Sequence, residues 1–310
     1  MTAIEIRGLT KEYRARRALD GLTVTVEPGR VTGFLGPNGA GKSTTLRILL
    51  GLDRPTAGSA TFGGRAYTAL REPLRHVGAL LDAGAAHGGR TARDHLRAVA
   101  AANRLPAGRV ARVLDEVGLS PAADRRVRTF SLGMRQRLGV ATALLGDPAV
   151  LLLDEPANGL DPEGIVRLRR LLRRLAAEGR TVLVSSHLMA ETAATADHVV
   201  VLGRGRLLAD RPTADLVRAA GGRRVRVRTA EPGRLAAALT DRGLSWEPAG
   251  DGWWLVADAG AEEVGRIAAA AGAPVLGLAD DHPTLEQAYL DLTGGAAEFA
   301  AGRTGAGEVE

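Results

Sequence analysis

The stretch Gly36-Pro37-Asn38-Gly39-Ala40-Gly41-Lys42-Ser43-Thr44 follows the pattern G-x-x-x-x-G-K-[ST]. Before it, Val31 to Leu35 is a short apolar run typical of a buried strand, and Ser43 to Leu50 carries apolar residues at helical spacing. Such a loop lets main-chain N–H groups surround a polyphosphate, and the helix N-terminus adds partial positive charge. We therefore predict that Lys42 binds the terminal phosphates and that the Ser43 hydroxyl binds Mg²⁺.

The composition supports this role for Lys42. The chain has 41 lysine and arginine residues, of which only Lys11 and Lys42 are lysines. A lysine at this position in so arginine-rich a chain indicates a site that needs a compact, rotatable ammonium group rather than a planar guanidinium group.

Length and composition limit the protein class. A chain of 310 residues suggests one large domain or two, and 45% hydrophobic and 25% charged residues are typical of a soluble globular protein. The absence of cysteine excludes disulfides, thiolate zinc sites and thiol nucleophiles. The start of the chain lacks a secretory-signal pattern, and the longest uncharged stretch, Ile267 to Ala279, is too short to span a bilayer.

The net charge of +6 has two interpretations. It could attract an anionic partner, either nucleic acid or a membrane surface, or it could reflect arginines dispersed among acidic residues. We favour the second, because no basic run interleaves with aromatic residues as in a nucleic-acid platform. The arginines between Arg167 and Arg174 are interpreted as the solvated face of a helix.

Acidic residues end a second buried strand. Val150 to Leu153 is a continuous apolar run followed by Asp154 and Glu155, and open α/β sheets bind ligands at the carboxyl ends of their strands. We expect Asp154 to hold Mg²⁺ opposite Ser43 and Glu155 to polarise the attacking water. The pair alone is weak evidence, but it is strong beside an upstream phosphate loop.

Two further residues have both a functional and an ordinary interpretation. His187 follows the strand Thr181 to Ser185 at the same sheet edge and could sense the γ-phosphate, or it could be a surface or capping histidine. Tyr13 lies in a polar connection between the strands Ala3 to Leu9 and Leu22 to Glu27. Its ring could stack on a nucleobase or belong to an ordinary loop.

The remaining pattern predicts further helices and a second module. A helix should begin at the N-cap Ser131, and Gly221-Gly222 marks a domain boundary. Residues 223–293 have the order β-α-β-β-α-β of a small ferredoxin-like α+β domain, and 294–310 should be a disordered tail. The tryptophans of this α+β domain are interpreted as core or interface residues: Trp246, Trp253 and Trp254.

In this order, the motifs resemble the ATP-binding subunit of an ATP-binding-cassette (ABC) transporter over residues 3–217. Gly36 to Thr44 matches the Walker A loop and Val150 to Glu155 matches the Walker B strand with its catalytic glutamate. Phe130 to Met134 lies where the family has its signature motif. The remaining matches are the D-loop, which runs from Asn158 to Asp161, the switch histidine His187 and the adenine-stacking Tyr13.

The resemblance implies an α/β P-loop NTPase fold, with a mixed sheet and a helical subdomain at about 84–147 within a domain of residues 1–220. It also implies ATP and Mg²⁺ as ligands and a homodimer or heterodimer of cassettes closed head to tail. ATP on one Walker A loop would then meet Ser131 and Gly133 of the other subunit, at the N-terminus of the signature helix.

The sequence departs from the family pattern at two places. Leu132 and Met134 replace a glycine and the glutamine of the signature, although Ser131 and Gly133 remain. Asp82 falls where the family usually has glutamine. An aspartate there could still bind Mg²⁺, but it adds a negative charge beside the γ-phosphate.

The appended module and the run from Thr284 to Leu290 resemble stand-alone ATPases of ABC-2 type drug and antibiotic exporters. We expect a peripheral protein at the cytoplasmic face of the membrane that powers a separate permease, with no nucleic-acid partner. One alternative is a soluble ABC ATPase acting on nucleic acid or ribosomes. We disfavour it, because the chain has one cassette and only about 90 residues separate Lys42 from Ser131. Another is an ATP-sensing module with little hydrolysis, which Asp82 keeps open.

Overall fold

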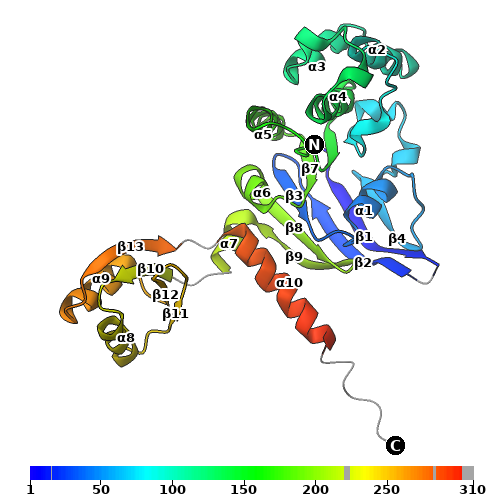
Figure 1. Ribbon diagram of the computed structural model, residues 1–310. Helices are drawn as coiled ribbons and strands as arrows, with labels where there is room; N and C mark the ends of the chain where they lie inside the picture. The colour runs from blue at the N-terminus through cyan, green and yellow to red at the C-terminus, as the bar shows by residue number, and fades with distance from the viewer. Residues whose placement is uncertain (15, 220–223, 282–283, 302–310) are drawn as a thin grey trace, which may run out of the picture. The chain divides into compact units, whose positions relative to one another are not determined.

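The computed structural model describes residues 1–14, 16–219, 224–281 and 284–301, with side chains described up to residue 293 (Figure 1). The chain divides into two compact units, Met1–Thr213 and Ala214–Glu310. The predicted boundary at Gly221-Gly222 lies outside the described residues, and the two compact units divide after Thr213. The helix α7 (Thr213–Ala219), which we had assigned to the first domain, begins at the boundary and lies almost wholly in the second unit.

A six-stranded sheet forms the centre of the first unit. All its strands are parallel except the last, which is antiparallel to its neighbour. Strand β3 (Val31–Leu35) is buried along its whole length, and so are most residues of the strands beside it. Both faces of the sheet are therefore covered, which explains the apolar runs of the sequence. The order is β5 (Val77–Leu80), β6 (Val150–Asp154), β7 (Thr181–Ser186), β3 (Val31–Leu35), β8 (His198–Gly203) and β9 (Arg206–Pro212).

A second, antiparallel sheet of three strands has the order β2 (Arg16–Val26), β1 (Ile4–Tyr13) and β4 (Ala57–Phe62). Helix α1 (Lys42–Leu49) contacts strands of both sheets and buries Leu46 and Leu49 in a shared core. The prediction for Tyr13 was wrong in one respect. Tyr13 is the last residue of β1 and pairs with Arg16 of β2, so it belongs to a hairpin rather than to a polar loop.

The predicted helical subdomain consists of α2 (Ala92–Ala102), α3 (Arg109–Glu116) and α4 (Leu132–Leu144), which pack on one another (Figure 1). Two short polar side chains start these helices. Thr91 caps α2 by accepting a hydrogen bond from the N–H of Asp94, and Ser131 caps α4 by accepting one from the N–H of Met134. The N-cap predicted at Ser131 is confirmed.

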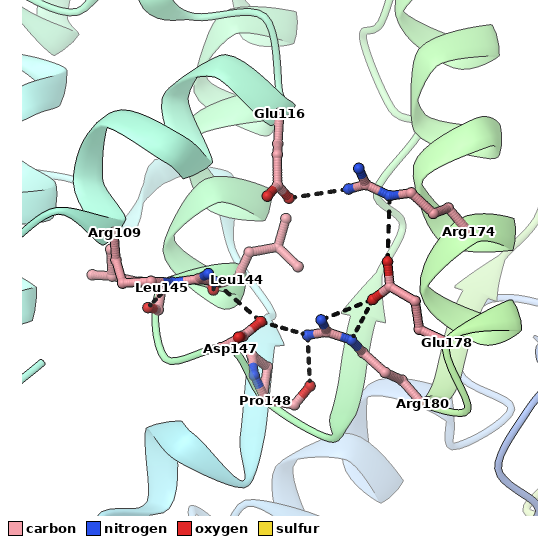
Figure 2. Close-up of polar contacts among 9 residues, drawn as sticks. All are labelled: Arg109, Glu116, Leu144, Leu145, Asp147, Pro148, Arg174, Glu178 and Arg180. Carbon is pink, nitrogen blue, oxygen red and sulfur yellow. Dashed lines mark hydrogen bonds and ion pairs between the residues drawn. The ribbon is translucent and has the colours of Figure 1, made fainter. Parts of the chain in front are cut away.

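A chain of alternating charges joins this subdomain to α5 (Pro162–Ala177) and to the loop before β7 (Figure 2). Its members are Arg109, Asp147, Arg180, Glu178, Arg174 and Glu116. The interpretation of the α5 arginines as a purely solvated face was therefore incomplete. Arg174 reaches Glu116 of α3 at 3.2 Å, and the half-buried Arg169 pairs with Glu191 of α6 (Met189–Thr195), a short helix that the sequence did not reveal.

The second unit has the predicted element order and a four-stranded antiparallel sheet. Trp246 stacks on Trp254 with ring centroids 4.4 Å apart, beside a core that contains Val225, Leu239 and Ile267. The elements are β10 (Arg224–Thr229), α8 (Pro232–Asp241), β11 (Trp246–Pro248), β12 (Trp253–Ala257), α9 (Ala261–Ala270), β13 (Val275–Asp281) and α10 (Leu285–Ala301). Since α10 continues to Ala301, a disordered tail does not begin at residue 294 as predicted, and 302–310 lie outside the described residues.

Candidate functional site

A cavity of about 490 Å³ lies at the carboxyl ends of β3 and β6, a volume typical of a small-molecule site. It brings together most of the residues that the sequence singled out, and it adds Arg16 and Ala18, which we had not identified. The complete lining is Tyr13, Arg16, Ala18, Pro37, Asn38, Gly39, Gly41, Lys42, Ser43, Thr44, Asp154 and Glu155. Gly36 and Ala40 belong to the same loop but do not line the cavity.

The loop between β3 and α1 needs glycine where it passes β2. Gly41 has φ +107°, and a Cβ atom there would lie 2.5 Å from Leu19 Cδ2 and 2.8 Å from the carbonyl oxygen of Ala18. No other residue fits both this backbone conformation and this space. The loop therefore presents main-chain groups at the start of α1, as a phosphate-binding loop requires.

Lys42 lies inside this loop and is only 7% exposed. Its Nζ atom donates hydrogen bonds to the carbonyl oxygens of Gly36 at 2.5 Å and Pro37 at 3.4 Å. Burial lowers the pKa of Lys42, while the nearby charges of Glu155 and Asp154 act in the opposite direction. A polyphosphate in the cavity would supply the countercharge that the buried ammonium group needs.

Asp154 and Ser43, two of the predicted magnesium ligands, contact each other. Its Oδ2 atom accepts a 2.7 Å hydrogen bond from Ser43 Oγ, and its Oδ1 atom accepts one from Ser185 Oγ at the end of β7. Among the residues that the structure describes, no group of three or more acidic or histidine side chains could hold a metal unaided. One hydroxyl and one carboxylate beside a phosphate site fit Mg²⁺, which commonly binds through few protein ligands together with substrate phosphates.

Glu155 lies at the rim of the same cavity. Its Oε2 atom is 2.8 Å from Nδ1 of His187, so the structure brings together the predicted catalytic carboxylate and the predicted switch histidine. His187 does not line the cavity, but it contacts the residue that does. The carboxyl ends of neighbouring parallel strands β6 and β7 bring the two side chains together.

Tyr13 also lines the cavity, and its ring is held in place. The hydroxyl group donates a 2.9 Å hydrogen bond to Asp53 Oδ2, and Lys11 Nζ lies 4.7 Å from the ring centroid. Asp53 in turn pairs with Arg47 of α1 at 2.8 Å. Partial burial and the bond to Asp53 raise the pKa of Tyr13, so the phenol stays protonated and the neutral ring is available for stacking.

Arg16 is a candidate ligand that sequence reasoning missed. It pairs with Tyr13 across the β1–β2 hairpin, and its Nη2 atom lies 3.0 Å from the point that a Cβ atom on Gly39 would occupy. Its guanidinium group therefore lies against the phosphate loop. The sequence shows only a basic residue three positions after Tyr13. The register of the hairpin is what turns the Arg16 side chain toward the cavity.

Ser131 and Gly133 begin α4 and do not line the cavity of their own chain. A Cβ atom on Gly133 would lie 2.6 Å from the carbonyl oxygen of Gly159, so α4 approaches the D-loop too closely for a side chain. Asp161 of that loop caps α5 through Gly164 N–H at 3.2 Å and accepts a 2.6 Å hydrogen bond from Arg137. These contacts hold the start of α4 against the D-loop.

Asp82, the predicted substitute for the family glutamine, also does not line the cavity. Its Oδ1 atom accepts a 2.7 Å hydrogen bond from the N–H of Gly84 and caps the short 3₁₀ turn Ala83–Ala85. The carboxylate is thus engaged within its own loop.

Comparisons with known proteins identify the family of this chain. The family described as ABC transporter matches residues 19–158, and a domain family of unknown function (DUF8746) matches residues 223–286. The bacitracin transport ATP-binding protein BcrA of Bacillus licheniformis is 42% identical over 214 residues, which cover 68% of this chain and 70% of BcrA. The daunorubicin resistance ATP-binding protein DrrA3 of Streptomyces coeruleorubidus is 35% identical over 309 residues, which cover 94% and 96% of the two chains.

A solved structure described as the ATP-binding subunit of an ABC transporter matches with a TM-score of 0.64 and 30% identity, over 70% of this chain and 92% of that one. This chain belongs to the ATP-binding proteins of the ABC transporter family, and its cassette is an ATPase.

Proposed function

We propose that this protein hydrolyses ATP to power a separate membrane permease that exports an antibiotic, a drug or another small hydrophobic compound. The observation that carries the proposal is the cavity in which Lys42, Ser43, Asp154 and Glu155 converge. The direction of transport is supported by the similarity to DrrA3, a resistance protein that matches nearly the whole chain. Within the described residues, no helix is both long enough and apolar enough to cross a bilayer. A peripheral position at the cytoplasmic membrane face, beside a permease, fits this finding.

The lining of the cavity supports a proposed role for each part of the nucleotide. Adenine stacks on the ring face of Tyr13 that Lys11 leaves free, and the phosphates lie on the loop with Lys42 and Arg16. Ser43 and Asp154 hold Mg²⁺, which neutralises phosphate charge when bound. Glu155 orients and polarises the attacking water, and His187 holds the Glu155 carboxylate through the 2.8 Å contact. Asp82 keeps its loop folded and is not required as a metal ligand.

The catalytic unit is proposed to be a head-to-tail dimer, either of two copies or with a related cassette. Its support is the position of Ser131 and Gly133, which lie at a helix N-terminus but outside the cavity of their own chain. Across a dimer interface, the Ser131 hydroxyl and the N–H groups of α4 would meet the γ-phosphate held by the partner. ATP would then close the dimer, and its hydrolysis would open it, which gives a permease two states to follow.

The second unit is proposed to be a ferredoxin-like accessory domain. Its element order and its antiparallel sheet order β11-β12-β10-β13 support this. The alternative of an ATPase working on nucleic acid or ribosomes is not favoured by the transport proteins found as relatives. The alternative of an ATP sensor is opposed by the intact pair of Glu155 and His187.

The first experiment compares the wild type with Glu155→Gln. We expect Mg-ATP to convert the variant from a 32.3 kDa monomer to a dimer, measured by size-exclusion chromatography with light scattering, while only the wild type releases phosphate. Glu163→Gln, an exposed residue of α5, is the control and should behave as the wild type. A variant that remains monomeric and retains full turnover would remove Glu155 from the catalytic role.

Export is tested in the native host by disrupting the coding sequence. We expect greater sensitivity to at least one hydrophobic antibiotic, with bacitracin and daunorubicin tested first, and rescue by the wild type but not by Lys42→Ala. Unchanged sensitivity and unchanged accumulation of fluorescent export substrates would contradict the exporter assignment without affecting the ATPase assignment.

A further inference from the structure

Gln136 is a buried polar residue of the signature helix that no role described above uses. It lies in α4, is 4% exposed, and its Nε2 atom donates a 2.7 Å hydrogen bond to the main-chain carbonyl oxygen of Glu155. Gln136 does not line the nucleotide cavity. Its bond therefore reaches Glu155, the proposed water-polarising residue, from the helix side rather than the nucleotide side.

The backbone of Glu155 needs such support. Glu155 has φ +48°, a left-handed conformation that is strained for a non-glycine residue and persists only where neighbours enforce it. Its N–H faces both the Oγ atom and the carbonyl oxygen of Ser185, at 3.1 and 3.2 Å. Its carbonyl oxygen accepts from Gln136 and, at 3.2 Å within the following turn, from the N–H of Asn158.

The next residue of α4 makes a parallel connection. Arg137 Nη2 donates a 2.6 Å hydrogen bond to Asp161, which caps α5. Two consecutive side chains of α4 thus hold the two ends of the segment from Glu155 to Asp161. The same helix carries Ser131 at its N-terminus. A displacement of α4 must therefore move this segment or break one of the two bonds.

We propose that Gln136 is a positioning residue for hydrolysis, which couples the location of the signature helix to the geometry of Glu155. This inference rests on the catalytic role proposed above for Glu155. In a head-to-tail dimer, the start of α4 meets the nucleotide held by the partner, whereas Glu155 serves the nucleotide of its own chain. Gln136 then makes hydrolysis at one site depend on whether the other site is closed.

The test separates positioning from packing. Gln136→Met keeps an unbranched side chain of similar length but removes the donor. Because a misplacement of about 1 Å can cost about 100-fold in rate, we expect kcat for ATP hydrolysis to fall between about 10-fold and about 100-fold. The KM for ATP should stay within about twofold, because Gln136 has no contact with the cavity.

A second variant gives a signature that packing alone cannot produce. In Gln136→Glu, a protonated carboxyl group can donate to the Glu155 carbonyl oxygen, but an ionised one cannot. Burial raises the pKa of a carboxyl group into the range where activity is measured. The ratio of its kcat to that of the wild type should therefore fall as pH rises from about 6 to about 8.5, while the ratio for Gln136→Met stays flat. The charged neighbours, Asp154, Glu155, His187 and Arg137, are the same in both variants.

Thr142→Val is the matched control on the same helix. Its hydroxyl donates to the carbonyl oxygen of Leu138 within α4 and has no contact with Glu155, so kcat should change less than about twofold. The double variant Glu155→Gln, Gln136→Met should still dimerise with Mg-ATP. Failure of Glu155→Gln itself to stop turnover would count against the proposed function rather than against Gln136.

Three results would overturn the role of Gln136. They are a wild-type kcat in Gln136→Met, equal and pH-independent ratios in the Met and Glu variants, and a raised KM with unchanged kcat. If Gln136→Met does not fold, as shown by its melting temperature, the pH profile of Gln136→Glu decides the question alone.

Discussion

Asp147→Asn tests how firmly the helical subdomain is attached to the rest of the cassette. Asp147 forms ion pairs with Arg109 of α3 at 3.3 Å and with Arg180, which precedes β7, at 2.9 Å (Figure 2). The arginine side chains are only 14% and 20% exposed, whereas Asp147 is 53% exposed. Asparagine tolerates the φ of +58° found at this position, so the substitution removes charge without adding backbone strain.

The expected loss follows from this mixed exposure. A hydrogen bond to a charged group contributes about 1.5–3 kcal/mol when well shielded, and an exposed ion pair about 0.2–1 kcal/mol. Arg109 also keeps its bonds to the carbonyl oxygens of Leu144 and Leu145, and Arg180 keeps Glu178. We therefore expect the free energy of unfolding to fall by about 1–2 kcal/mol in total, with the melting temperature lowered by roughly 2–8 °C.

Urea unfolding followed by circular dichroism measures this difference, with Glu72→Gln as the control. Glu72 pairs with Arg75 at 3.3 Å, and both side chains are about half exposed, so its loss should cost less than about 0.5 kcal/mol. In 1 M salt the Asp147→Asn deficit should shrink only in part, because screening acts weakly on the shielded arginines. A deficit no larger than that of Glu72→Gln, or one that salt abolishes, would refute the attachment role.

Three further predictions concern the nucleotide site. In Gly133→Ala, the new methyl group would lie 2.6 Å from the carbonyl oxygen of Gly159. ATP turnover should therefore fall at least about 10-fold, while binding of a fluorescent ATP analogue to the monomer is unchanged. Full turnover would show that α4 can shift freely. Arg16→Gln should weaken the binding of ATP and ADP about 5-fold to 20-fold in calorimetry and leave adenosine binding unaffected. Arg7→Gln is the control. An equal loss of affinity for adenosine would place the guanidinium group away from the phosphates. Burial lowers the pKa of Lys42 and phosphates favour its charged form, so ATP affinity should decline as pH rises through that lowered pKa toward 10.5. In that pH range ATP binding should take up a proton, which calorimetry in buffers of different ionisation enthalpy detects. An ATP affinity that does not depend on pH would contradict this prediction.

The local patterns of the sequence were sufficient for the elements that carry the phosphate site. The loop from Gly36 to Thr44 lies between β3 and α1 as predicted, and Asp154 ends a strand that is buried along its length. The N-cap at Ser131 was also predicted, because a capping side chain bonds to an N–H only a few residues ahead. Spacing along one segment determines these features.

Contacts between segments that are distant in sequence were decided by the tertiary structure. Tyr13 reaches Asp53 across 40 positions, and Gln136 reaches Glu155 across 19. Neither bond has a sequence signature, because strand register and helix packing determine which side chains meet. The same reason explains the missed Arg16, whose place in the cavity depends on the β1–β2 pairing. It also explains Arg169 and Arg174 of α5, which pair with Glu191 of α6 and Glu116 of α3. The sequence by itself therefore determined the chemistry of the phosphate site, while the packing of α4 against β6 and the D-loop decided how that chemistry is held in place.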